Sequence, residues 1–318
     1  MKLSLHLGAH KTATTYIQQV LRANRSSLAK RGIAYVPLNE LRDEFSGLVL
    51  RKPTQGESLL VRLNRKRKIK AFLKRQVTVP SDSSLPPVER LILSEENLIG
   101  TPSGIVSDGQ LYREIGDRLS ALREHVEHFD IEVFLGVRHQ GYFSSSVFAE
   151  AVTQPTGLSH NDSFFREEWL RHSNSWVTII DVIRDAFPEA PILVWDYDEF
   201  SALESRVLSK ICGAANRMRL PKRPADPVRQ TFSHKAITEL LAAQEMGGPD
   251  ARLAKRQEAR LAHPRNEDNP AFSLWSDEQL EKLGAGFQRD LEAISGMGNA
   301  VTLLSKRRRR KSNTRPDH

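Results

Sequence analysis

Near the start of the sequence, a strand pattern, a glycine turn and a helix start follow one another, and this segment constrains the fold most. Residues 3–7 alternate apolar and polar side chains, Gly8 opens a tight turn, and Thr14 and Thr15 begin a helix. A helix N-terminus presents unpaired backbone N–H groups and a partial positive charge, so it attracts phosphate or sulfate. Lys11 adds a full positive charge, and the two threonine hydroxyls add donors. The segment therefore predicts an anion-binding loop.

The spacing differs from the Walker pattern, in which a lysine directly follows the second glycine. Here Lys11 stands three residues after Gly8, and threonines follow it. A strand-turn-helix corner with incidental polar side chains is the alternative interpretation. The candidate anion-binding residues of this loop are Gly8, Lys11, Thr12, Ala13, Thr14 and Thr15.

Further strand patterns alternate with helical ones along the chain. They fall at residues 33–36, 91–93, 131–137 and 191–195. This alternation predicts an α/β fold with a central parallel sheet and helices on both faces. The final third shows no strong strand pattern and is predicted to be helical, with a last helix over residues 277–294. We expect a single domain over residues 1–304 and a basic, disordered tail over residues 305–318.

Composition excludes several classes of protein. No run of about 18 apolar residues exists, so no membrane-spanning helix is predicted. No signal-peptide pattern precedes the first strand, and the one cysteine, Cys212, excludes an intramolecular disulfide and a cysteine-rich metal site. Together these features predict a cytoplasmic protein.

The net charge of +8 is concentrated in two basic segments. Residues 51–76 hold ten Lys or Arg and one acid, and residues 306–318 hold seven and one, so the remainder is net negative. The chain therefore does not resemble a uniformly basic nucleic-acid binder. Residues 58–76 are predicted as a basic helix with a solvated face, and binding of an acidic glycan acceptor is the alternative. Its apolar side chains are expected loosely on one side: Leu59, Leu60, Leu63, Ile69, Phe72 and Leu73.

Arg138 directly follows the strand pattern 131–137, and Ser146 stands eight residues later in the next helix. An arginine fork and a serine hydroxyl at a helix start can hold one phosphate from two sides. Ser144 or Ser145 replaces Ser146 if the helix register shifts. The alternative is an arginine paired with a surface carboxylate beside a serine-rich helix cap.

Glu95 and Glu96 follow the strand pattern 91–93. Because ligands of open parallel sheets bind beyond the carboxyl ends of the strands, these glutamates, the first loop and Arg138 are expected at one rim. A carboxylate there can act as a general base. Adjacent glutamates in a loop also serve as solvated side chains or helix caps.

The two phosphate-binding patterns resemble those of sulfotransferases that use 3′-phosphoadenosine 5′-phosphosulfate (PAPS), a P-loop-like family with bacterial members, over roughly the first 200 residues. The resemblance implies sulfuryl transfer from PAPS to a hydroxyl acceptor, such as a carbohydrate or another alcohol. It implies that Lys11 and the threonines hold the 5′-phosphosulfate, and that Arg138 and Ser146 hold the 3′-phosphate. The family's Ser-x-Glu segment favours Glu96 over Glu95 as the base. Rival bases are His139, His160 and His172.

The sequence departs from the family at Ala13, where glycine is usual, and at His10, where proline is frequent. The family's C-terminal Lys-Gly cofactor loop is not evident. One rival function is a P-loop-type kinase, for which Asp196 or Asp198 would hold Mg²⁺. The other is a non-enzymatic polyanion or nucleic-acid binder. We expect no metal in the sulfotransferase site and no nucleic-acid partner.

Overall fold

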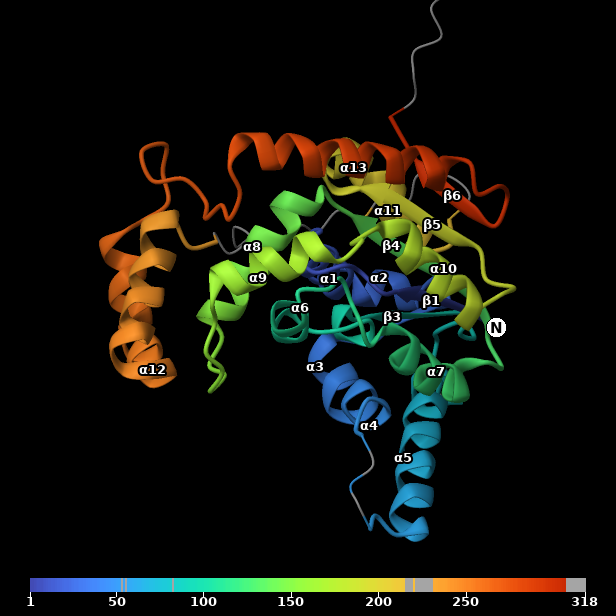
Figure 1. The fold of residues 1–318 in the computed structure, drawn as a ribbon. Coiled ribbons are helices and arrows are strands. Elements are labelled where there is room, and N and C mark those ends of the chain that lie inside the picture. Colours follow the sequence, from blue (N-terminus) through green and yellow to red (C-terminus); the bar gives the residue numbers. More distant parts are fainter. Residues whose placement is uncertain (53, 55, 82, 215–219, 221–230, 307–318) are drawn as a thin grey trace, which may run out of the picture.

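The computed structural model describes the chain except for residues 53, 55, 82, 215–219, 221–230 and 307–318. Its centre is a six-stranded sheet in the order β2-β3-β1-β4-β5-β6, in which every neighbouring pair is parallel (Figure 1). The strands are β1 Lys2–His6, β2 Ile33–Tyr35, β3 Arg90–Ser94, β4 Asp130–Val137, β5 Ile192–Asp196 and β6 Val301–Leu304. The predicted α/β fold with a parallel sheet is confirmed.

Helices fill the connections between the strands, and further helices lie in the last third of the chain. The α-helices are α1 Thr14–Ala23, α2 Arg25–Ala29, α3 Leu38–Leu41, α4 Gly47–Val49, α5 Leu59–Val77, α6 Pro102–Asp108, α7 Ile115–Val126, α8 Gln140–Thr153, α9 Asp162–Arg171, α10 Trp176–Ala186, α11 Phe200–Ile211, α12 His234–Ala262 and α13 Asp277–Ser295. A π-turn η1 covers Arg42–Ser46, and 3₁₀ turns cover Glu96–Leu98 (η2) and Tyr197–Glu199 (η3). Among the described residues, no helix combines the length and the apolar character that crossing a membrane requires.

The two faces of the sheet are covered by different helices because strand side chains alternate between faces. Leu3 and Leu5 of β1 belong to one apolar core, with helices α7, α8, α10 and α13. The opposite face packs on α1, α2 and α11, whose core includes Phe134 and Trp195 from β4 and β5. Helices on both faces are therefore confirmed.

Four details of the sequence prediction are wrong. A short edge strand, β6, lies in the final third and pairs with β5. The sequence pattern predicts one helix from the first loop to about residue 30, but the structure breaks it at Asn24. It also predicts a long helical region over residues 162–187, which is interrupted at residues 172–175. Leu59, Leu60 and Leu63 do not join the buried side of α5, because they are 68%, 77% and 44% exposed.

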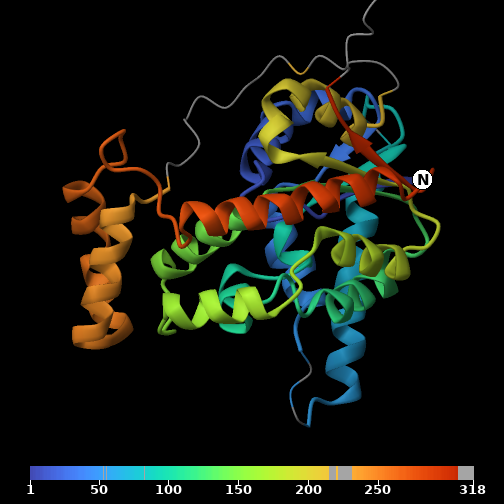
Figure 2. The same ribbon diagram turned by 45° about the horizontal axis from the view of Figure 1, so that its top comes forward.

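Two helical segments extend from the sheet region. The N-terminal half of α5 projects from it, and α12 stands at its side as a pair of helical arms (Figures 1 and 2). The arms of α12 meet at Gly247 and Gly248, whose backbone angles are not helical. The single-domain organisation over residues 1–304 stays a prediction, and the predicted disordered tail lies outside the described residues from 307 onward.

Candidate anion-binding site

The three predicted clusters follow the carboxyl ends of β1, β3 and β4, which are neighbours in the sheet. The chain leaves β1 towards β2 on one side and leaves β4 towards β5 on the other. Loops that diverge in this way open a crevice at the sheet edge, where ligands of α/β folds bind. The first loop follows β1 and Arg138 follows β4, so both border this edge of the sheet.

The loop between β1 and α1 has an unusual backbone. Gly8, Lys11 and Ala13 have φ angles of 43°, 63° and 66°, all in the left-handed region. Ala13 thus has the conformation for which glycine is the usual residue. It is also the N-cap of α1, and no side chain caps the first amides of the helix. Those N–H groups provide donors for an anion.

The threonines of the loop have different surroundings. The hydroxyls of Thr12 and Thr14 donate to the carbonyl of Ala9 at 2.6 and 3.2 Å, which tightens the turn. Thr15 is exposed at the start of α1. The hydroxyls of Thr12 and Thr14 therefore stabilise the loop itself, whereas Thr15 is exposed and Lys11 keeps its charged side chain free of contacts within the loop.

Arg138 joins two segments that are far apart in the sequence. Its Nη1 donates to the carbonyl of Lys11 at 3.3 Å and to the Ser146 hydroxyl at 3.2 Å. Its guanidinium also stacks on Tyr197, 4.8 Å from the ring centroid. Among the described residues, no carboxylate forms an ion pair with it, and its buried Nε has no hydrogen-bond partner. Burial lowers the pKa of this guanidinium.

The serine register in α8 is resolved by hydrogen bonds inside the helix. Ser144 and Ser145 donate to the carbonyls of Gln140 and Gly141 at 2.7 and 2.8 Å. Both also accept hydrogen bonds from residues 274–275. Ser146 is therefore the serine that faces Arg138.

Glu150 is a residue of the rim that sequence reasoning missed. Its Oε2 lies 3.4 Å from Nζ of Lys11. It stands four residues after Ser146, which places both side chains on one face of α8. That spacing is the signal that would have found it. The Lys11–Glu150 pair connects α8 to the loop, as Arg138 does.

The two predicted glutamates have different environments, although the guanidinium of Arg42 binds both. It lies 2.8 Å from the Glu95 carboxylate and 3.0 Å from that of Glu96. Glu95 is fully buried and accepts a bond from Ser46 at 3.0 Å, and burial raises its pKa against the opposing effect of Arg42. Glu96 keeps a 15% exposed side chain and accepts a bond from Gln18 of α1 at 3.1 Å. Only Glu96 therefore lies at the rim.

Histidines lie behind the loop. His10 bonds to Asn97 through Nε2 at 3.2 Å and to the Tyr112 hydroxyl through Nδ1 at 3.0 Å. His6 is fully buried beneath the loop, its Nδ1 2.7 Å from the Ser94 hydroxyl, and its Nε2 has no partner. Burial lowers the pKa of His6 to about 4. Both rings are placed as neutral supports of the loop.

The histidines predicted as rival bases have local partners. Nδ1 of His139 accepts from the Gly141 amide at 3.1 Å and so caps α8. His160 is buried, and burial lowers its pKa to about 4. His172 lies 3.7 Å from Glu168 at the end of α9. The structure therefore does not bring them together with Glu96.

Asp196, a candidate magnesium ligand, accepts a bond from the Asp198 amide at 2.9 Å and caps the turn after β5. Among the described residues, no group of three or more His, Cys, Asp or Glu side chains is placed to hold a metal ion.

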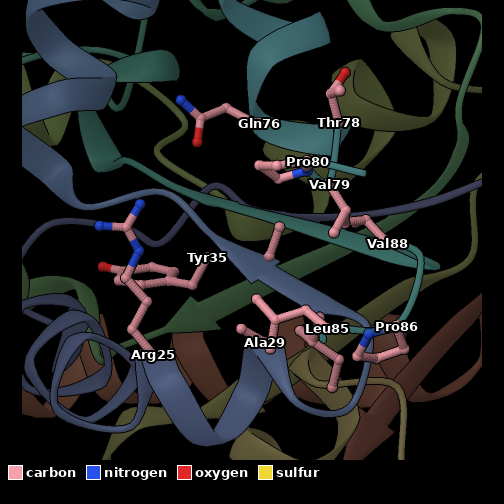
Figure 3. A pocket seen from close by; sticks show the side chains of 12 residues that line it. Arg25, Ala29, Tyr35, Gln76, Thr78, Val79, Pro80, Leu85, Pro86 and Val88 are labelled. Carbon is pink, nitrogen blue, oxygen red and sulfur yellow. The ribbon is translucent and has the colours of Figure 1, made fainter. Parts of the chain in front are cut away.

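A separate pocket of about 170 Å³ lies beside β2 and contains none of these residues (Figure 3). Apolar side chains such as Ile33, Leu85 and Val88 dominate its lining, with Arg25 and Gln76 among the polar ones. It therefore does not form part of the anion-binding rim.

No protein-family model matches this sequence. No curated protein matches it either. Among solved structures, it is similar to a sulfotransferase from Alicyclobacillus acidocaldarius, with 13% sequence identity, coverage of 80% of this chain and 95% of that chain, and a TM-score of 0.38. A likeness of this size carries no argument about activity, which has to be argued from the side chains at the rim.

Proposed function

We propose that this protein is a PAPS-dependent sulfotransferase that acts on a hydroxyl-bearing acceptor. The observation that carries the proposal is the position of Arg138, which bonds to the loop at Lys11 and to Ser146 while no described carboxylate forms an ion pair with it. A donor with phosphates at both its 5′ and 3′ positions fits a rim that carries two cations, Lys11 and Arg138. The orphaned Nε of Arg138 supports this fit, because buried donors normally have an acceptor.

PAPS supplies the sulfuryl group, and the acceptor oxygen forms the new bond to sulfur while the bond from sulfur to the phosphate oxygen breaks. Lys11, Thr15 and the first amides of α1 hold the 5′ end and stabilise the charge that develops on the departing phosphate. Arg138 and Ser146 hold the 3′-phosphate. Glu96 takes the proton of the acceptor hydroxyl, and the Arg42 and Gln18 contacts orient its carboxylate.

The acceptor is a carbohydrate or another alcohol, and a glycan suits the resemblance best. The reaction needs no metal on this proposal. A cytoplasmic enzyme of bacterial type is also part of the proposal. An ATP-dependent kinase and a non-enzymatic polyanion binder are the outcomes against which it is tested.

Ligand-induced thermal shifts distinguish these functions. 3′-Phosphoadenosine 5′-phosphate (PAP) at about 100 times its Kd stabilises a protein by about 2.7 kcal/mol, which raises Tm by several degrees. We expect this shift with PAP and none with ATP and Mg²⁺. A shift with ATP and Mg²⁺ alone would indicate a kinase, and salt-sensitive DNA binding without a PAP shift would indicate a polyanion binder.

Arg138→Ala tests the assignment of the 3′-phosphate. Loss of one charge-assisted bond costs about 1.5–3 kcal/mol, so PAP affinity should fall roughly 10–150-fold while 5′-AMP affinity changes little. Arg123→Ala, at an exposed position of α7, is the matched control and should leave both affinities unchanged. Equal losses of PAP and 5′-AMP binding would show that Arg138 does not read the 3′-phosphate.

A further inference from the structure

Helix α5 is anchored to the rest of the protein mainly through its C-terminal half. Its buried side chains are Ile69, Phe72 and Leu73, and Phe72 stacks on Phe45 at 5.9 Å between ring centroids. The N-terminal half projects away from the sheet in both ribbon views (Figures 1 and 2). This half therefore presents its side chains to the surroundings.

The projecting half carries a cluster of exposed leucines. Leu59, Leu60 and Leu63 are 68%, 77% and 44% exposed, and Val61 beside them is 47% exposed. Single exposed apolar residues are common, but a cluster at the end of a projecting helix indicates a contact surface.

Cationic side chains follow the leucines along one face of the helix. At 3.6 residues per turn, side chains spaced three and four apart share a face. We call this face the α5 stripe and define it by Leu59, Leu60, Leu63, Arg67, Lys70 and Lys74. The stripe is thus apolar at its outer end and basic along the rest of its length.

The charge of α5 is one-sided. Its sequence contains eight Lys or Arg and no acidic residue. Three of these cations pair with acids from other segments: Arg65 with Glu57, Lys66 with Glu124, and Arg75 with Glu44. Among the described residues, Arg67, Lys70 and Lys74 of the stripe form no ion pair. The stripe therefore offers free positive charge beside an apolar end.

We propose that the α5 stripe docks the protein on an anionic lipid surface. Leucines at the end of the helix enter the boundary between headgroups and acyl chains, and the three cations bind the headgroups. A nucleic acid or an acidic glycan would use the cations but gain nothing from the leucines. A second copy of the helix is disfavoured because eight cations would face eight others. The proposal is independent of sulfuryl transfer.

Vesicle co-sedimentation of the full chain tests the docking. We expect binding to phosphatidylcholine vesicles that contain about one third phosphatidylserine, little binding to phosphatidylcholine alone, and weaker binding as salt is raised. Replacing Arg67, Lys70 and Lys74 by Gln should lower the partition coefficient on the order of 100-fold, since each cation near the surface contributes about one kcal/mol. Replacing Leu59, Leu60 and Leu63 by Ser should lower it at least roughly tenfold.

A charge-matched control replaces three exposed lysines elsewhere, Lys210, Lys235 and Lys282, by Gln, and should retain binding. Tm of each variant is measured in parallel, and no change is expected because every substituted side chain is exposed. Wild-type binding by the leucine variant would overturn the proposal. Absence of vesicle binding, or equally tight binding of double-stranded DNA that is insensitive to the leucines, would also overturn it and assign the stripe to another partner or to solvent.

Discussion

Arg138 is a cation held in a partly buried position by one carbonyl, one hydroxyl and one aromatic ring. Burial disfavours a charge unless an opposite charge or several hydrogen bonds compensate it. Among the described residues, no carboxylate forms an ion pair with Arg138, and the negative charge of nearby Asp198 offsets only part of the effect of burial. Glu150, by contrast, already neutralises Lys11 at the other end of the rim. We therefore expect Arg138 to contribute more than Lys11 to the binding of an anion. Lys11 should contribute more to stabilising the transition state of the proposed reaction.

The Lys11→Ala variant tests this division of roles. Charge grows on the departing phosphate during sulfuryl transfer, so a cation at the loop stabilises the transition state more than the bound donor. We expect kcat to fall on the order of 100-fold while PAP affinity, measured by calorimetry, falls much less. Lys30→Ala, at an exposed position after α2, serves as the control. Unchanged kcat with a raised KM would confine Lys11 to binding.

Glu96→Gln tests the assignment of the base. The change keeps the shape of the side chain but removes its ability to accept a proton, so turnover should fall by ~10²–10⁴-fold with PAP binding retained. The assay uses PAPS with a surrogate alcohol. Glu95→Gln is the matched variant: because Glu95 is buried and holds Arg42 and Ser46, it should lower Tm more than turnover. Full activity of the Glu96 variant would contradict the assignment.

At the scale of elements, the loop between β1 and α1 holds two non-glycine residues, Lys11 and Ala13, in the left-handed region. An L-residue costs about 1–2 kcal/mol there, because its Cβ approaches the following carbonyl. The hydrogen bonds of Thr12 and Thr14 to the Ala9 carbonyl help to hold the loop in this conformation. A rigid loop of this kind is ready for its ligand before binding.

The Ala13→Gly variant measures this strain. Removing the Cβ should raise the free energy of unfolding by about 1 kcal/mol in urea denaturation, since glycine adopts a positive φ without steric cost. Ala285→Gly, at an exposed position inside α13, is the control and should lower it by about 1 kcal/mol. Equal destabilisation in the two variants would show that Ala13 carries no strain.

How far the sequence predicts an element depends on whether its signal is local. The parallel sheet and the pairing of Arg138 with Ser146 follow from short-range spacing, so the sequence alone predicts both. β6 was missed because a four-residue edge strand with one exposed side chain leaves little apolar periodicity. The contact of Tyr197 with Arg138 depends on how β5 is placed in space and has no local signal, whereas Glu150 has one in its spacing of four residues from Ser146. The leucines of α5 were misassigned because one half of the helix packs and the other does not.

Across the whole molecule, the pKa of buried His6 makes stability depend on pH. Its folded-state pKa of about 4 lies below the ordinary value of 6.5, so between these values the unfolded chain binds more protons. The contribution of neutral His6 to the free energy of unfolding is therefore complete above pH 6.5 and is lost as pH falls towards 4. From pH 7 to pH 5 the loss should be about 2 kcal/mol.

Urea denaturation at pH 7 and pH 5 checks this dependence. From pH 7 to pH 5, the free energy of unfolding should fall by about 2 kcal/mol less in His6→Gln than in the wild type, whatever the stability of the variant at pH 7. The comparison uses the difference between two pH values, so a general destabilisation by the substitution cancels. An identical pH dependence in both proteins would contradict the placement of a neutral His6 beneath the loop.

The central position of β1 has a consequence for synthesis on the ribosome. Its neighbours in the sheet, β3 and β4, follow far along the chain, and Lys2 meets Asp130 across 128 positions. At roughly 5–20 residues per second, β1 waits on the order of ten seconds for its second partner. Until β3 and then β4 are synthesised, its leucines and its unpaired edges are open to other nascent chains. A chaperone that holds this segment early in translation should therefore increase the yield of folded protein more than one added after release.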